Sequence, residues 1–211
     1  MMDRYEETFQ TWNKIAELYE TKFMDLDLYN DSYDYICHSL AVINSKILEI
    51  GCGPGNITKY LLNQRPDFDI LGIDVAPNMI ELAQKNNPTA RFAVMDCRQI
   101  EEIQTQFEGI VCGFCLPYLS QNDSLTFISD CSNLLKAKGL LYVSFVEGEP
   151  SNSAFQVGSS GERSYFYFHR LNDLKIVLLQ NGFEEIEVFK VKYKRTETEI
   201  EVHTILVAKK R

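Results

Sequence analysis

Short apolar runs alternate with amphipathic stretches in the middle of the chain, between about residues 45 and 147. The apolar runs predict strands at 46–51, 69–74, 90–96, 107–114 and 139–147. The stretches between them carry apolar side chains at three- and four-residue steps and predict helices at 55–65, 77–86 and 121–137. Strands that alternate with helices in this way form a parallel sheet covered on both faces. The pattern therefore predicts a doubly wound α/β domain.

The segment before this region is helical and rich in aromatic side chains. Residues 5–44 begin with apolar side chains at helical spacing, and a second helix is predicted from about residue 33 to residue 42. We expect residues 1–44 to form a helical cap that belongs to the same domain as residues 45–211.

The segment after this region begins with a polar stretch. Residues 147–164 are rich in Gly and Ser, which is typical of a loop. A predicted helix at 171–181 then ends at Gly182, a residue that commonly terminates helices. The alternating segments 183–193 and 198–210 predict an antiparallel pair of strands that completes the fold.

Composition narrows the class of protein. The chain has 211 residues, 45% of them hydrophobic, which is enough for one substantial core. Its formal net charge of −9 argues against a general nucleic-acid binder and against a DNA partner. The N-terminus is charged without an apolar core, and no apolar run approaches the roughly 18 residues that span a membrane. We expect a cytoplasmic protein without a membrane partner.

The six cysteines lie mostly inside predicted strands and helices, which favours free thiols in a reducing compartment. The pair Cys112-x-x-Cys115 could be a redox motif or half of a zinc site. The chain has no second such pair, and the three histidines are scattered along the sequence. Buried or cleft-lining thiols are therefore the favoured interpretation, and we predict no metal.

The glycine-rich stretch KILEIGCGPGN, residues 46–56, contains the first predicted strand and the turn after it. Its spacing, Gly51-x-Gly53-x-Gly55, matches neither the G-x-G-x-x-G of dinucleotide sites nor a P-loop. Glu49, just before the turn, would repel a pyrophosphate and suits a cationic ligand, such as an amino acid joined to a nucleoside. Asp74 ends the second predicted strand, where a carboxylate can accept both hydroxyls of a ribose.

Asp96 ends the third predicted strand, so three acids lie at the edge where open α/β sheets bind ligands. With these acids in place, ILEIGCGPGN resembles the first motif of the class I S-adenosylmethionine-dependent methyltransferases. LGIDVAPNMIELAQKN, FAVMDCRQI and FEGIVCGFCLPYL are similar to the next three motifs of that family. The resemblance covers roughly residues 46–147. It implies a Rossmann-like sheet of order 3-2-1-4-5-7-6 with an antiparallel seventh strand.

The resemblance also implies S-adenosyl-L-methionine as the cofactor, with Asp74 at the ribose and Asp96 and Cys97 at the adenine. The full set of implied cofactor contacts is Glu49, Gly51, Cys52, Gly53, Gly55, Asp74, Val75, Met79, Asp96, Cys97 and Phe114.

The methyl acceptor should lie beyond the fourth strand, near residues 114–119. Oxygen and nitrogen acceptors can need a general base, and the candidate catalytic residues are Tyr118, Tyr19 and His169. Tyr19 belongs to an A-x-x-Y pattern that resembles the lid helix of small-molecule members, and His169 comes directly after four consecutive aromatic residues. The segment at Tyr118 lacks the [DNS]-P-P-[YFW] signature of enzymes that methylate nucleic-acid amines.

The leading hypothesis is methyl transfer to a small-molecule substrate by in-line substitution. A methyltransferase that acts on a protein or an RNA, and an inactive protein that binds the same cofactor, remain alternatives. A nicotinamide-dependent dehydrogenase is disfavoured by the glycine spacing. The acceptor atom stays open, and so does the choice between a monomer and a homodimer.

Overall fold

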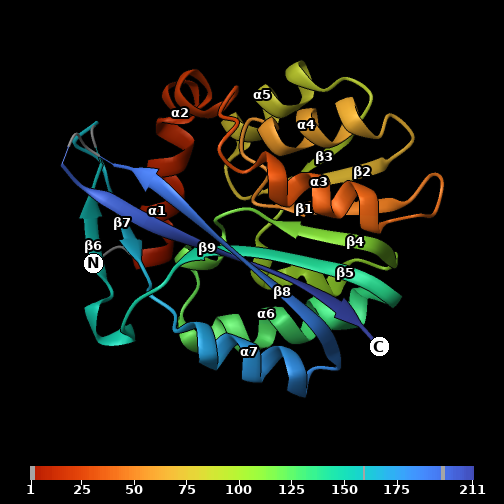
Figure 1. Ribbon diagram of the computed structural model, residues 1–211. Coiled ribbons are helices and arrows are strands. Elements are labelled where there is room, and N and C mark those ends of the chain that lie inside the picture. Colours follow the sequence, from red (N-terminus) through yellow and green to blue (C-terminus); the bar gives the residue numbers. More distant parts are fainter. Residues whose placement is uncertain (1–2, 159, 196–197) are drawn as a thin grey trace.

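The computed structural model describes residues 3–158, 160–195 and 198–211, and a seven-stranded sheet runs through the protein (Figure 1). Its strands are β1 (Lys46–Ile50), β2 (Asp69–Asp74), β3 (Arg91–Val94), β4 (Phe107–Cys112), β5 (Leu135–Val146), β8 (Phe183–Lys194) and β9 (Ile200–Lys210). They lie in the order β3-β2-β1-β4-β5-β9-β8, and β9 runs antiparallel to β5 and β8. The predicted order 3-2-1-4-5-7-6 with an antiparallel last strand is confirmed.

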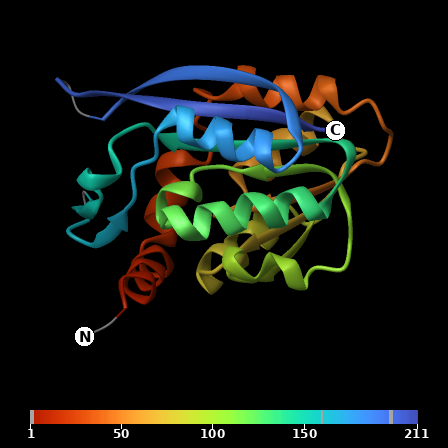
Figure 2. The ribbon, with the colours of Figure 1, turned by 90° about the horizontal axis from the view of Figure 1, so that it is seen from below.

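Helices cover both faces of this sheet. One face carries α3 (Asn30–Ser39), α4 (Asn56–Gln64) and α5 (Pro77–Asn86). The other carries α6 (Gln121–Leu134) and α7 (Leu171–Gln180), which Figure 2 shows in front of the strands.

Alternation along the central strands places their side chains in two separate core clusters. On β5, Leu141, Val143 and Phe145 pack among residues of α6 and α7, whereas Leu140 and Tyr142 pack among residues of α3 and α4. All five side chains are buried, and burying each contributes about 1.5–3 kcal/mol before entropy is counted. This two-sided core explains why the sequence reads as nearly continuous apolar runs.

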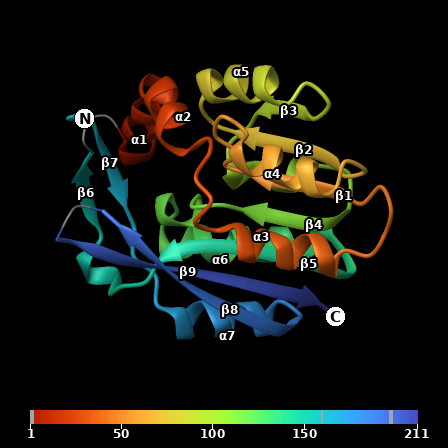
Figure 3. The same ribbon diagram turned by 45° about the horizontal axis from the view of Figure 1, so that its top comes forward.

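The N-terminal segment forms two helices, α1 (Arg4–Lys14) and α2 (Ala16–Phe23), with the backbone non-helical at Ile15 between them. Figure 3 shows both helices beside the carboxyl ends of the parallel strands. Because α3 packs in the core of the sheet, residues 1–44 are not all peripheral. The division at residue 44 stays a prediction.

The polar stretch expected to be a loop at 147–164 contains regular structure, so that expectation is wrong in part. β6 (Ala154–Val157) and β7 (Arg163–Phe166) form an antiparallel hairpin apart from the main sheet. The hairpin is tied to α1, because Thr11 Oγ1 donates to the Arg163 carbonyl at 2.7 Å and Tyr165 N donates to Thr8 Oγ1 at 3.0 Å. These tertiary bonds align the hairpin on α1, outside the main sheet.

Within the described ranges, three short 3₁₀ helices complete the fold: η1 (Cys97–Glu102), η2 (Leu116–Tyr118) and η3 (Pro150–Asn152). The predicted helix at 121–137 ends earlier, at Leu134, because Leu135 already pairs with Phe107 of β4. Over the described ranges, no helix combines the length and apolar character that a membrane crossing requires.

Candidate active site

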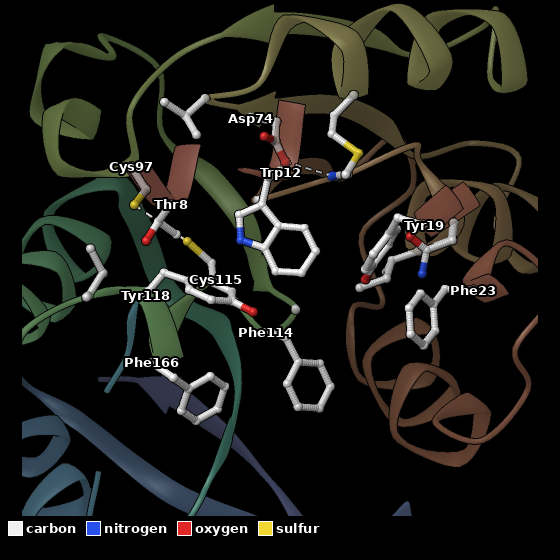
Figure 4. Close-up of a pocket in the computed structure, with 18 of the residues that line it drawn as sticks. Thr8, Trp12, Tyr19, Phe23, Asp74, Cys97, Phe114, Cys115, Tyr118 and Phe166 are labelled. Atoms are coloured by element: carbon white, nitrogen blue, oxygen red, sulfur yellow. Dashed lines mark hydrogen bonds between the residues drawn. The ribbon is translucent and has the colours of Figure 1, made fainter. Parts of the chain in front are cut away.

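A cavity of about 280 Å³ lies at the carboxyl ends of the parallel strands, beneath α1 and α2 (Figure 4). This edge includes the point between β1 and β4 where the strand order reverses, the usual ligand position in open α/β sheets. The predicted cofactor residues that line it are Gly51, Gly53, Asp74, Val75, Met79, Asp96, Cys97 and Phe114. Glu49, Cys52 and Gly55 are not among its lining residues.

The turn after β1 begins at Gly51, where the backbone is left-handed and packed closely against the cavity wall. Gly51 N and Cys52 N both donate to the Ile73 carbonyl of β2, at 2.8 and 3.0 Å. Gly51 has φ +68°, and a Cβ there would lie 2.9 Å from Cys115 Cβ. Any side chain at this position would therefore be strained and would crowd the cavity wall.

Gly55 was among the implied cofactor contacts, but it does not line the cavity and has a packing role instead. It precedes α4 with φ +82°, and a Cβ there would lie 2.3 Å from Nδ2 of Asn87. That amide donates to the Gly55 carbonyl at 2.9 Å. The third glycine lets α4 approach the end of α5.

Asp74 is bound to the glycine turn through its carboxylate. Oδ2 accepts from Gly53 N at 2.9 Å, and Oδ1 accepts from Ala76 N at 2.9 Å. Burial raises the pKa of this carboxyl group, and the two N–H bonds oppose the shift. An ionised carboxylate has about four acceptor positions, so about two remain for a pair of ligand hydroxyls.

Asp96 lines the cavity and is also paired with Arg98. Its carboxylate accepts from Arg98 N, Nε and Nη2, the last at 2.6 Å. The guanidinium of Arg98 also lies over the ring of Tyr5 on α1, 4.1 Å from its centroid. Asp96 therefore joins the edge of the sheet to the covering helix. Contact with an adenine at this residue stays a prediction.

Glu49 is fully buried beneath the turn. Thr58 Oγ1 donates to its Oε2, while Oε1 has no hydrogen-bond partner in the described part of the chain. Burial raises the pKa of Glu49 to about 8. A buried acceptor with an unused oxygen fits a ligand that brings a positive charge, since a nearby cation lowers such a pKa again.

The cover of the cavity is aromatic. Trp12 of α1 makes edge contacts with Tyr19 of α2 and with Tyr118, at centroid distances of 5.7 and 5.3 Å (Figure 4). Burial raises the pKa of both tyrosines, so they remain neutral phenols rather than ready bases. Phe114 takes φ +55°, a strained value for a bulky residue, and its N–H donates to Ser144 Oγ at 2.8 Å.

His169, a candidate base from the sequence, does not line the cavity. Its ring is buried and its Nε2 lies 3.1 Å from the Leu116 carbonyl, while its backbone bridges to Glu147. It is a structural histidine that connects η2 to the end of β5. The histidine that lines the cavity is His203 of β9, paired beside Val146. Sequence reasoning missed it, although the predicted pairing of the last strand could have located it.

All six cysteines are free thiols, and Cys97 and Cys115 line the cavity with their sulfurs 3.5 Å apart. Across the residues that the structure describes, no three His, Cys, Asp or Glu side chains gather as a metal site.

Comparisons with known proteins agree with this geometry. Residues 47–139 match a family model described as a methyltransferase domain. Protein 235L of Invertebrate iridescent virus 6 is 31% identical over 136 residues, which are 64% of this chain and 49% of that protein. Trans-aconitate 2-methyltransferase of Enterobacter sp. is 35% identical over 117 residues, 51% of this chain and 42% of that protein. The chain thus spans about half or less of the length of these relatives.

Among solved structures, magnesium protoporphyrin IX methyltransferase from Synechocystis, with bound S-adenosylmethionine, superposes with a TM-score of 0.73. The match covers 100% of this chain and 99% of that one at 17% identity, a level that shows the fold. In its strand order and over residues 47–139, the chain is similar to the S-adenosylmethionine-dependent methyltransferases.

Proposed function

We propose that this protein transfers a methyl group from S-adenosylmethionine to a small-molecule acceptor. The observation that carries the proposal is a single cavity with two unlike halves. The half at β1 to β3 has the glycine turn and carboxylates, and the half at β4, β5 and β9 has mainly aromatic rings. Two substrates of different chemistry can meet in such a space.

The first half offers groups that suit each part of the cofactor. Asp74 would accept the ribose hydroxyls, Gly51 and Gly53 would leave room for the amino-acid chain, and Glu49 would balance its positive end. Val75, Met79 and Cys97 would border the adenosine. When bound, S-adenosylmethionine supplies an electrophilic methyl group on a sulfonium. The protein's own task is then to align an acceptor and to exclude water.

A small acceptor is favoured over a macromolecule because the cavity is covered. α1 and the β6–β7 hairpin are joined by hydrogen bonds, and Trp12 of α1 contacts both Tyr118 in the wall and Tyr19 of α2. A protein or RNA segment could enter only if these contacts broke. Some similar proteins are named for small acceptors. They include the trans-aconitate methyltransferase named above and the demethylmenaquinone methyltransferase of Thermotoga maritima, which is 27% identical over 104 residues.

Trp12 provides the first test, because it is the only tryptophan of the chain and lines the cavity. Titration with S-adenosylmethionine, S-adenosylhomocysteine or NAD should change its fluorescence with the first two ligands only. A response to NAD alone would refute the proposal.

Asp74→Ala provides the second test. It removes an acceptor of charge-assisted bonds worth about 1.5–3 kcal/mol each, so affinity for S-adenosylhomocysteine should fall at least tenfold. Asp69→Ala is the matched control, since Asp69 begins the same strand and pairs with Arg91 at the opposite edge. Equal affinities for the two variants would mean that Asp74 does not hold the ligand. Transfer of labelled methyl to small-molecule and to macromolecular fractions then separates the acceptor classes.

A further inference from the structure

A chain of three hydrogen-bonding side chains, two of them buried and the third partly exposed, lies in the half of the cavity farthest from Asp74. Tyr29, Glu201 and His203 all line the cavity. His203 is near the start of β9 and pairs with Val146, at the carboxyl end of β5. In the strand order, β1, β4 and β5 lie between β9, which carries Glu201 and His203, and the carboxylates of β2 and β3.

The ring of His203 is bonded at both nitrogens. Nδ1 lies 2.7 Å from the hydroxyl of Tyr29, and Nε2 lies 3.4 Å from Oε2 of Glu201. Its faces are also fixed, since Tyr193 stacks on it at 4.8 Å with an angle of 16° and Phe114 meets it edge-on at 4.6 Å. The imidazole is thus held in one plane and one position.

The partners determine where the proton of the imidazole lies. An ionised carboxylate only accepts hydrogen bonds, so Nε2 carries the proton and donates it to Glu201. Nδ1 is then an acceptor and takes its bond from the Tyr29 hydroxyl. Carboxylate, imidazole and hydroxyl are arranged in the order that activates a hydroxyl in hydrolase triads.

We infer that Tyr29, His203 and Glu201 form a relay that removes the proton from an uncharged hydroxyl acceptor. This inference rests on the proposed function and names the acceptor class for the same cavity. The acceptor donates its proton to Tyr29 Oη, and Tyr29 passes its own proton to Nδ1 of His203. The electron pair of the broken O–H bond stays on the acceptor oxygen, which becomes the nucleophile. Glu201 balances the imidazolium that results.

The charges around the ring suit this direction of transfer. Burial lowers the pKa of His203 and keeps the imidazole neutral near pH 7, while Glu201 acts in the opposite direction and favours the protonated ring. The titratable groups that face it are Tyr29, Tyr193 and Glu201, and Arg195 pairs with Glu201 from the exposed side at 3.0 Å.

The same surroundings restrict the acceptor. Among the described residues that line the cavity there is no lysine and no arginine, whereas Asp74, Asp96 and Glu201 are acidic. A carboxylate or phosphate in the acceptor would have no cation to pair with and would meet like charge. An uncharged ring that packs against Phe114 and Tyr193 meets neither penalty.

A phenol that reports its own ionisation tests the relay without turnover. We would titrate 4-nitrophenol, whose anion alone absorbs visible light, into the protein loaded with S-adenosylhomocysteine. If the relay takes the proton, the bound phenol should ionise about one pH unit or more below the free phenol. In His203→Asn it should ionise as the free phenol does. Tyr29→Phe, which removes only the hydroxyl, should have the same effect.

The controls separate the relay from folding and from cofactor binding. His38→Asn changes an exposed histidine of α3 and should behave as the unaltered protein does. 4-Nitrobenzoate has the same ring with a carboxylate and should bind at least tenfold more weakly. Equal binding of the two probes, no binding of 4-nitrophenol, or an unchanged shift in both variants would overturn the inference. If S-adenosylhomocysteine does not change the Trp12 fluorescence of the unaltered protein, the proposed function would be refuted instead.

Discussion

Gly55→Ala tests whether the third glycine of the turn is needed for packing rather than for a ligand. Gly55 has φ +82° and its carbonyl accepts the Asn87 amide at 2.9 Å. A Cβ at this position would lie 2.3 Å from the same amide nitrogen and 3.3 Å from the Ala83 backbone. Asn87 is 4% exposed and would have to move away from its partner.

The cost has two parts. A left-handed φ costs an L residue about 1–2 kcal/mol, and a stiffer unfolded chain returns about 0.4–1 kcal/mol of this. Displacing a buried amide from its acceptor costs about 1–3 kcal/mol more. Gly182→Ala is a matched control, because Gly182 also has φ +82° but no atom lies within 4 Å of the added Cβ. We expect a loss of about 1 kcal/mol for Gly182→Ala and about 2–4 kcal/mol for Gly55→Ala.

Urea denaturation followed by circular dichroism gives the free energy of unfolding for both variants and for the unaltered chain. The affinity of folded Gly55→Ala for S-adenosylhomocysteine should change little, because Gly55 does not line the cavity. Equal destabilisation of the two variants, or a selective loss of ligand affinity in Gly55→Ala, would refute the reasoning.

Two further predictions concern charge. Burial raises the pKa of Glu49 from 4.5 to about 8, so the folded chain keeps a proton that the unfolded chain releases, and stability falls as pH rises through that window. Urea denaturation should therefore show that Glu49→Gln becomes more stable relative to the unaltered chain as pH rises from about 5 to 8. A difference in the free energy of unfolding that does not change with pH would contradict this. Arg98→Gln removes the contacts of Arg98 with Asp96 and Tyr5 at a partly exposed site, which should destabilise the docking of α1 by about 1 kcal/mol. Hydrogen exchange of the α1 amides should therefore speed up about fivefold. Arg91→Gln breaks an exposed ion pair at the opposite edge and should leave α1 unchanged.

Periodicity located the elements of the main sheet, since the strand predicted at 69–74 and the helix predicted at 77–86 have the observed bounds, whereas the order of the strands was implied by the family resemblance. The sequence pattern agrees with the tertiary structure there, because the apolar runs of the central strands β1, β4 and β5 are buried on both faces. The β6–β7 hairpin lacked such a signal. Its strands pair outside the core, and their alignment depends on bonds from Thr8 and Thr11, which lie near the other end of the chain.

Part of the candidate site could also be located from the sequence and part could not, and the reason is strand direction. Asp74 could be located from the sequence because the carboxyl ends of parallel strands meet at one edge. β9 is antiparallel, so its first residues, not its last, reach that edge, and this is where Glu201 and His203 lie. A search confined to the carboxyl end of each strand overlooks them. The groups suited to the cofactor thus come from ends of parallel strands, and the groups suited to the acceptor come from the start of the reversed strand. A change at the start of β9 can therefore alter the acceptor without disturbing the carboxylates that suit the cofactor.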